Sequence, residues 1–320
     1  MGYVTKRFDV VTFGESMTLF TPLREQSLEY SDTVNRSFGG AESNVAIGLA
    51  RLGVRVGWFG QLGDEPQGRY ILKRIRGEGV DVSQARLVTT ANTGLMMRHK
   101  VAGREEVFYY RKHSAASMMR PEDLDEAYMK EAAILHITGI TPALSDSCRA
   151  AVQRAVQIAK EHGVRVSFDP NLRLKLWTIE EARAVLLPLA EQADYFLPGM
   201  DELKRLYASD DELEIMDHVK QLSALSIVKG VGETNVIVHN GQTTAVPYEK
   251  LDDVVDTIGA GDAFAAGFLA GIVKGYTPEQ SVRMGNLSAG FVIRGYGDWE
   301  LVPTWQQLQQ AMQNETVIER

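Results

Sequence analysis

Short apolar runs alternate with amphipathic segments along most of this sequence, and that alternation restricts the fold more than any other feature. The runs are rich in β-branched and aromatic residues, which favours strands, and the segments between them carry apolar residues at helical spacing. Chains that alternate strand and helix form mostly parallel sheets covered by helices on both faces. The predicted strands are 8–13, 54–59, 132–139, 164–169, 193–199 and 225–230.

Helices are predicted between most of these strands, and several helix starts carry recognisable caps. A capping box places Ser or Thr three residues before Glu or Gln, so that each side chain satisfies a backbone N–H group. The predicted boxes are Thr178 with Glu181, Thr277 with Gln280, and Thr304 with Gln307. The clearest predicted helices are 41–53, 67–79 and 146–163.

Two segments, about 15–38 and 93–115, interrupt the alternation because they show strand-like patterns without helices. In the second segment "AGRE" (102–105) is typical of a turn between two strands. We expect these segments to form a small β-sheet that acts as a lid on the α/β core. No internal repeat or low-complexity linker divides the chain, so a single domain over residues 1–320 is predicted.

Charge and cysteine content narrow the classes of partner. A net charge of −8 argues against a nucleic-acid partner and requires any anionic substrate to be held by locally placed Arg or Lys residues. Cys148 is the single cysteine, which excludes an intramolecular disulfide, and we expect a buried, unreactive thiol. The six histidines show no metal-binding spacing.

No targeting or membrane segment is recognisable. The N-terminal "MGYVTKRFDVV" lacks the apolar stretch of a signal peptide, and the uncharged run 263–273 is too short to cross a bilayer. We therefore expect a soluble, cytoplasmic protein without a membrane partner.

The stretch "DTIGAGDAF" (256–264) is the first candidate site. Gly259, Ala260 and Gly261 precede an apolar helical run, and small residues at a helix start let an anion approach backbone N–H groups that lack intrahelical partners. Asp262 would repel phosphate as a ligand but is suited to act as a general base toward an attacking hydroxyl. The plainer alternative is a tight turn followed by an Asp near a helix start. Neither a P-loop nor a dinucleotide-binding glycine motif is present.

The residues around this stretch favour an anion-binding helix start over a simple tight turn. The segment 256–267 resembles the C-terminal signature of the ribokinase-like (PfkB) carbohydrate kinases. About 200 residues earlier, "GGAESNVAIGLARLG" (39–53) and "GQLGDEPQG" (60–68) resemble the N-terminal signature of that family. The resemblance extends over residues 8–312. It implies a three-layer α/β/α sandwich with a mostly parallel central sheet and a small β-sheet lid.

The resemblance also implies roles for single residues. Asp262 would be the catalytic base beside the Gly259-Ala260-Gly261 anion hole, with ATP and Mg²⁺ as cofactors. Gly40 and Asn44 match positions that contact sugar hydroxyls, although a glycine turn and a helix cap are the plainer readings. Further implied roles are a monovalent cation such as K⁺ near Asp256 and Ala289, and an adenine pocket at Asn286; packing roles are the alternative for both.

Two family patterns are incomplete here. The magnesium-associated N-x-x-E pattern reads Gly199-Met-Asp-Glu202, so the asparagine is missing and Glu202 is left to order water around Mg²⁺. The nucleotide-side pattern T-x-G-x-x-G is eroded to "VKGVGETN" (228–235). Within it, Lys229, Gly230 and Gly232 are the expected ATP-side residues.

Two arginines suggest the substrate. Tyr109 and Arg111 are two apart and face the same side of a predicted strand, whereas Arg173 follows the predicted strand 164–169, where parallel sheets bind ligands. Guanidinium groups match carboxylates in geometry, so the pair predicts a carboxylate-bearing sugar. The alternatives are a solvated Arg111, and an Arg173 paired with a nearby acid or with ATP phosphate.

Both clusters, together with "TGLMMR" (93–98) and "GITPAL" (139–144), resemble the sugar-acid branch of the family, the 2-keto-3-deoxygluconate kinases. That resemblance implies that Arg111 and Arg173 lie near the substrate carboxylate and that Tyr109 contacts the substrate. Met96 stands where some relatives place an aromatic residue against the sugar. The implied reaction transfers the γ-phosphoryl group of ATP to the C6 hydroxyl of 2-dehydro-3-deoxy-D-gluconate.

Other functions remain open from the sequence. A neutral-sugar kinase of the same family, such as a fructokinase or ribokinase, would share every motif except the two arginines. A non-catalytic sugar-acid sensor would keep the fold without the chemistry. The exposed edges of the lid strands predict a homo-oligomer that pairs them, because unpaired strand edges invite association.

Overall fold

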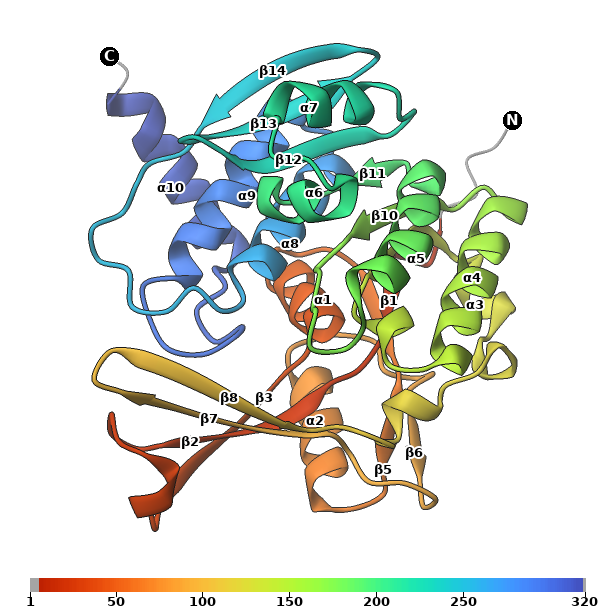
Figure 1. The fold of residues 1–320 in the computed structure, drawn as a ribbon, viewed down its shortest axis with the longest axis vertical. Helices are drawn as coiled ribbons and strands as arrows, with labels where there is room; N and C mark the ends of the chain where they lie inside the picture. The colour runs from red at the N-terminus through yellow and green to blue at the C-terminus, as the bar shows by residue number, and fades with distance from the viewer. Residues whose placement is uncertain (1–5, 319–320) are drawn as a thin grey trace.

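The computed structural model describes residues 6–318, which are built around an eight-stranded sheet (Figure 1). The run from β4 through β1, β9, β10 and β11 to β12 is parallel, and β13 and β14 extend it as an antiparallel hairpin. In spatial order the strands are β14 (Gln242–Pro247), β13 (Thr234–His239), β12 (Leu225–Val231), β11 (Tyr195–Phe196), β10 (Arg165–Asp169), β9 (Ala132–Thr138), β1 (Phe8–Phe13) and β4 (Val56–Phe59).

Helices cover both faces of this sheet, which gives the predicted three-layer α/β/α arrangement. Each layer of helices packs its apolar side chains into a separate core cluster against the sheet. One face carries α3 (Glu126–Met129), α4 (Asp146–Glu161), α5 (Ile179–Gln192), α6 (Met200–Tyr207) and α7 (Glu212–Lys220). The other carries α1 (Ala41–Arg51), α2 (Pro66–Gly77), α8 (Ala260–Val273), α9 (Pro278–Val292) and α10 (Trp305–Ile318).

A second sheet of four strands lies below the main sheet in Figure 1 and is called the small sheet here. The two interrupting segments of the sequence build it, as predicted. Its strands run in the order β3 (Val34–Gly39), β2 (Met17–Pro22), β7 (Leu95–Val101) and β8 (Arg104–Tyr110). The predicted turn between β7 and β8 uses Ala102 and Gly103, both with positive φ, which suits a two-residue hairpin loop.

The predicted strands are confirmed, with one large difference in length. β11 covers only Tyr195–Phe196 of the predicted 193–199, because Pro198 has no N–H to donate and α6 begins at Met200. Two features were not predicted: the β13–β14 hairpin, and a separate pair of parallel strands, β5 (Gln61–Gly63) and β6 (Arg86–Val88). Short 3₁₀ helices occupy Leu28–Tyr30, Ala116–Met118, Pro121–Asp123 and Thr141–Ala143.

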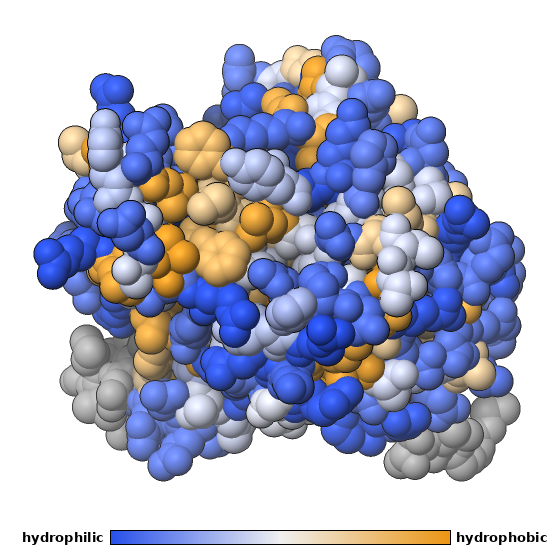
Figure 2. Space-filling view, turned by 90° about the horizontal axis from the view of Figure 1, so that it is seen from below, coloured by the Kyte–Doolittle hydropathy of each residue, from blue (hydrophilic) through white to orange (hydrophobic). Residues whose placement is uncertain are grey.

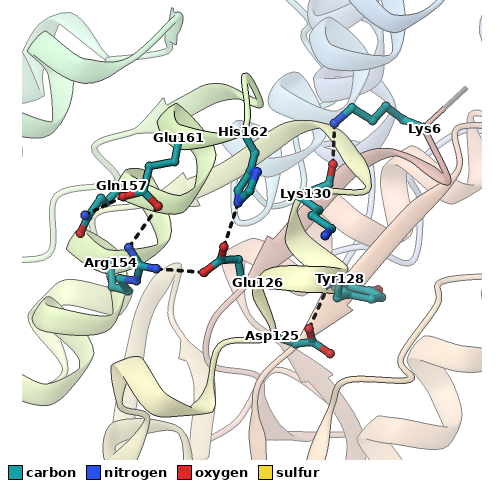
Figure 3. Close-up of polar contacts among 9 residues, drawn as sticks. All are labelled: Lys6, Asp125, Glu126, Tyr128, Lys130, Arg154, Gln157, Glu161 and His162. Carbon is teal, nitrogen blue, oxygen red and sulfur yellow. Dashed lines mark hydrogen bonds and ion pairs between the residues drawn. The ribbon is translucent and has the colours of Figure 1, made fainter. Parts of the chain in front are cut away.

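Caps and surface contacts fix the helices locally. The three predicted capping boxes all form, at the starts of α5, α9 and α10. Figure 3 shows how α4 holds α3: Arg154 and His162 both contact the Glu126 carboxylate, each at 2.9 Å. Exposed pairs of this kind contribute at most about 1 kcal/mol each. No helix in the part of the chain that the structure describes is long and apolar enough to cross a membrane.

Candidate active site

A cleft of about 1430 Å³ opens between the small sheet and the carboxyl ends of the main-sheet strands. Its walls come from β2, β7 and β8, from the first turns of α1 and α8, and from the segment that follows β10. Ligands of parallel sheets bind at this end of the strands. The sequence-predicted residues that line the cleft are Gly40, Asn44, Met96, Tyr109, Arg111, Arg173, Glu202, Lys229, Gly259, Gly261 and Asp262.

The first turn of α8 faces the cleft with backbone donors. Gly259 caps the helix with φ of 78°, and a Cβ there would lie 2.0 Å from the Asp298 carbonyl oxygen, so only glycine fits. Ala260 donates its N–H to the Thr257 carbonyl oxygen. Within residues 6–318 the N–H groups of Gly261 and Asp262 have no acceptor, and the space beside Gly261 is open. These two donors can therefore bind an anion.

Asp262 lies in the first turn of α8, partly accessible from the cleft. Its Oδ2 accepts a 2.7 Å hydrogen bond from Asn44 Nδ2, which fixes the orientation of the carboxylate. Burial raises the pKa of Asp262 to about 7, although the hydrogen bond from Asn44 acts to lower it. The negative charges of Asp169 and Asp298 also raise this pKa. A carboxyl group with that pKa is a stronger base near neutral pH than an ordinary Asp.

Asn44 and Gly40 come from the start of α1. Gly40 is the cap residue, and a Cβ there would lie 2.1 Å from the Glu15 carbonyl oxygen, so the backbone approach requires glycine. Asn44 receives the Gly40 N–H at 3.4 Å while donating to Asp262. The structure therefore places Asn44 against the candidate base, a contact that the sequence did not predict.

Arg111 is held by an acid that the sequence analysis did not single out. Its guanidinium forms an ion pair with the buried carboxylate of Glu15, which also accepts a 2.8 Å hydrogen bond from Ser114 Oγ. The guanidinium lies 5.6 Å from the centre of the Tyr109 ring. The signal that could have found Glu15 is its position: an acidic residue two positions after a buried parallel strand lies at the ligand-binding edge.

Arg173 differs from Arg111 because it forms no ion pair in the described part of the chain, although its positive charge acts on Asp262 and opposes the rise in the pKa of that carboxyl group. Its Nη1 donates only to the Leu172 carbonyl oxygen, at 3.2 Å, and the side chain is exposed. Lys175, on the same segment, lies 5.8 Å from the Tyr109 ring centre. Met96 is buried and packs with Met17 and Leu19 in the small sheet. Arg173, Lys175 and Tyr109 therefore make one wall of the cleft basic and aromatic.

A polar cluster lies beside α8. Lys229 Nζ contacts Asp169 Oδ2 at 2.9 Å, and Glu202 accepts the backbone N–H groups of Leu172 and Gly199 at 2.7 and 2.8 Å. Burial and the nearby Asp169 raise the pKa of Glu202. Asp169 was not predicted, although it ends a buried strand. In residues 6–318 no group of three or more His, Cys, Asp or Glu side chains is placed to hold a metal ion, and the magnesium role of Glu202 stays a prediction.

Several predicted residues lie outside the cleft lining. Gly230 lies within β12, where the pairing with β13 shifts register, and Gly232 follows the end of that strand; both have positive φ. Asn286 Oδ1 accepts from Asn235 Nδ2 at 2.6 Å, and its amide nitrogen donates to the Pro247 carbonyl oxygen at 3.3 Å. Asn286 therefore ties α9 to the β13–β14 hairpin, as the packing alternative anticipated, and its adenine role stays a prediction.

Asp256 is buried in an ion pair with Arg98 of β7, at 2.9 Å. Asp298 lies in the same region, and burial raises its pKa to about 7 although the Arg98 charge opposes that shift. Neither Arg98 nor Asp298 was predicted as a site residue. Arg98 and Asp298 line the cleft. Because Arg98, Asp256 and Asp298 come from segments far apart in the sequence, no local sequence pattern points to their interaction.

Cys148 is fully buried in α4, as predicted, and burial raises the pKa of its thiol to about 11, which disfavours the reactive thiolate.

Comparisons with known proteins identify the family. The pfkB family carbohydrate kinase model matches residues 7–305. The chain is 36% identical to the 2-dehydro-3-deoxygluconokinase of Bacillus subtilis, covering 94% of each chain. It is 32% identical to the 5-dehydro-2-deoxygluconokinase of Bacillus velezensis, covering 93% of this chain and 92% of the other.

Solved structures of carbohydrate kinases also match the fold of this chain. The 2-dehydro-3-deoxygluconokinase of Thermotoga maritima superposes with a TM-score of 0.86 at 26% identity, covering 95% of this chain and 98% of the other. An uncharacterized sugar kinase of Pyrococcus horikoshii in complex with ATP gives 0.80 at 24% identity, covering 94% and 97%. The chain has the ribokinase-like fold, belongs to the pfkB family of carbohydrate kinases, and is a phosphotransferase with an alcohol group as acceptor.

Proposed function

We propose that the protein is an ATP-dependent kinase that phosphorylates the C6 hydroxyl of 2-dehydro-3-deoxy-D-gluconate. The observation that carries the proposal is the position of Arg173, which forms no ion pair in the described chain, in the same cleft as Asp262 and close enough for its charge to act on that carboxyl group. Similarity to the 2-dehydro-3-deoxygluconokinases of Bacillus subtilis and Thermotoga maritima supports the same substrate class.

Asp262 is the proposed general base. Asn44 holds its Oδ2, which leaves Oδ1 to accept the proton of the attacking hydroxyl. A pKa of about 7 keeps the carboxylate partly ionised at neutral pH and close to the ideal for proton transfer. The N–H groups of Gly261 and Asp262 bind phosphoryl oxygens at the same helix start, where the helix dipole favours negative charge.

ATP and Mg²⁺ are the proposed cofactors, and the residues present fit them. When bound, they supply the phosphoryl group and neutralise its developing charge. The open donors at Gly261 and Asp262 fit phosphate, and Lys229, which is paired with Asp169, is close enough for its charge to act on Asp262 as well. Glu202 and Asp169 supply carboxylates for water-mediated contact to a metal. Gly230 and Gly232 remain proposed nucleotide-side residues.

The substrate carboxylate is proposed to bind at the basic wall. Arg173 and Lys175 form no ion pair in residues 6–318, whereas the charge of Arg111 is already shared with Glu15. Arg111 therefore acts as an orienting neighbour of Tyr109 rather than as the main carboxylate ligand. Gly40 and Asn44 are the proposed contacts to sugar hydroxyls, and Met96 contributes apolar surface.

The test of this function is ADP release from ATP and Mg²⁺ with three acceptors offered separately: 2-dehydro-3-deoxygluconate, fructose and ribose. We expect the keto acid to be preferred by a large factor in kcat/KM. Arg173→Gln should raise KM for the keto acid by about tenfold or more, since a charged hydrogen bond contributes about 1.5–3 kcal/mol. A preference for fructose or ribose would identify a neutral-sugar kinase, and turnover of none would favour a sensor.

Two further proposals concern the surroundings of the site. The small sheet is proposed to close over the sugar and exclude water. K⁺ at Asp256 stays a prediction, checked by comparing KCl with NaCl in the same assay.

The small sheet is also proposed to mediate a homo-oligomer. β3 and β8 are its edges, and β8 exposes Phe108 and Tyr110. Figure 2 shows apolar side chains gathered between hydrophilic ones on the face seen from below. Light scattering of the purified protein would give the oligomeric state, and a strict monomer would contradict the pairing of these edges.

A further inference from the structure

Arg98 connects the small sheet to the loop that leads into α8. It lies on β7, yet its side chain is only 7% exposed because it reaches Asp256, whose side chain is 5% exposed. Nη1 lies 2.9 Å from Asp256 Oδ2, and Nε lies 3.2 Å from Glu105 Oε1 on β8. A buried ion pair therefore joins the two parts of the protein that enclose the cleft.

The same Asp256 carboxylate also shapes the approach to the anion-binding turn. Its Oδ1 accepts the Ile258 N–H at 3.0 Å, which forms a local turn directly before Gly259, the cap of α8. On the other side of that turn, the Asp298 carbonyl oxygen packs against Gly259. A shift of Asp256 would therefore displace the start of α8, where the free N–H groups of Gly261 and Asp262 lie.

We propose that Arg98 is a positioning residue: through Asp256 it makes the small sheet hold the α8 turn in the geometry that phosphoryl transfer requires. Closure of the small sheet over the sugar and assembly of the anion-binding turn then become one event. The inference rests on the proposed kinase function of this cleft. It assigns Arg98 no contact with either substrate.

The charges of the cluster support this role. Asp256 and Glu105 contact the Arg98 guanidinium, and the same charge acts on Asp298 against burial and the negative charges of Glu300, Asp256 and Glu105. Arg98 therefore offsets the repulsion among these carboxylates. In residues 6–318 Asp298 Oδ1 has no hydrogen-bond partner, and the Arg98–Asp256 contact is an ion pair without an aligned hydrogen bond. Without the guanidinium the buried carboxylates repel one another, and the turn carrying Asp256 is the segment free to move.

The kinetic test compares Arg98→Met with Arg98→Lys and with Arg104→Met, a matched control on an exposed position of the same sheet. We expect Arg98→Met to lower kcat by about 10- to 100-fold, the usual effect of misplacing catalytic groups by about 1 Å, with little change in KM for the sugar acid. Arg98→Lys should recover part of kcat, and Arg104→Met should match the unmodified protein.

Coupling through Asp256 is tested by Asp256→Asn and by the double variant. If Arg98 acts through Asp256, adding Arg98→Met to Asp256→Asn costs no further kcat. The double variant also removes the buried Asp256 charge that Arg98→Met alone leaves unpaired. The comparison of the double variant with Asp256→Asn therefore stays valid if Arg98→Met folds poorly. Fully multiplicative effects on kcat would overturn the proposal, as would an Arg98→Met effect confined to KM, which would make Arg98 a ligand of the substrate.

Hydrogen exchange of the ligand-free protein separates this inference from the function on which it rests. In Arg98→Met the amides of Ile258, which donates to Asp256, and of Ala260, which donates to Thr257, should exchange faster than in the unmodified protein and in Arg104→Met, because their anchor is lost. Unchanged exchange of these two amides would refute the coupling whatever the substrate is. Faster exchange in a protein that phosphorylates none of the three acceptors would leave the coupling standing and remove the proposed function.

Discussion

Single residues at the bottom of the cleft have environments that alter their chemistry. Asp262 is the main example, because burial and the neighbouring Asp169 and Asp298 raise its pKa while Asn44 holds it in place. The sequence predicted Asp262 and the small residues before it, since helix starts have a recognisable pattern. It could not predict the raised pKa of Asp262, which depends first on burial and then on carboxylates that the fold brings together.

The raised pKa leads to a pH dependence. The ionised form of Asp262 is the base, so kcat/KM for the sugar acid should rise tenfold per pH unit below about pH 7 and level off above it. The measurement is kcat/KM between pH 5.5 and 8.5 with saturating ATP and Mg²⁺. A flat profile over that range would exclude Asp262 as a base with this pKa.

Helices and strands were predictable where their signals are local. The capping boxes of α5, α9 and α10 and the turn between β7 and β8 follow from adjacent residues, and all of them form. The β13–β14 hairpin had a comparable signal in Asn240-Gly241, both with positive φ, which the sequence analysis overlooked. β11 is shorter than predicted because an apolar run does not show where backbone pairing stops.

The cap of α5 offers a test at the scale of one element. Thr178→Ala should reduce the free energy of unfolding by about 1 kcal/mol, because the Glu181 N–H loses its acceptor. Activity should not change, because α5 contributes no residue to the cleft lining. Chemical denaturation and kcat measured on the same preparation check both parts. A tenfold loss of kcat would show that α5 influences the site, against this account.

At the scale of the whole molecule, the site depends on contacts between segments far apart in the sequence. Asn44 with Asp262, Glu15 with Arg111, and Arg98 with Asp256 each join different parts of the chain. The family resemblance predicted which segments meet at the cleft. It could not predict these pairs, because each partner also has an ordinary local role as a cap, a strand residue or a surface charge.

Buried carboxyl groups should also make the stability of the whole molecule depend on pH. The pKa of Asp298 is raised from 3.8 to about 7 in the folded protein, so the native state keeps a proton that the unfolded chain has released. Its stabilising contribution is complete below about pH 4 and is lost as pH rises through 7. His136, whose pKa burial lowers to about 4, acts in the opposite direction.

A variant isolates the Asp298 contribution. Asp298→Asn should gain stability relative to the unmodified protein between pH 5 and pH 8, by up to about 3 kcal/mol, since one pKa unit corresponds to about 1.4 kcal/mol. Urea unfolding of both proteins at the two pH values measures this difference. A stability difference independent of pH would show that Asp298 stays ionised throughout that range.

The central claim is that the carboxylate at the start of α8 acts as the base in phosphoryl transfer to a sugar acid. Its most direct test is kcat of Asp262→Asn with 2-dehydro-3-deoxygluconate, because this substitution keeps the size and shape of the side chain. We predict a fall in kcat of about 100-fold or more, with the circular dichroism spectrum and KM for ATP little changed. A kcat close to that of the unmodified protein would contradict the claim.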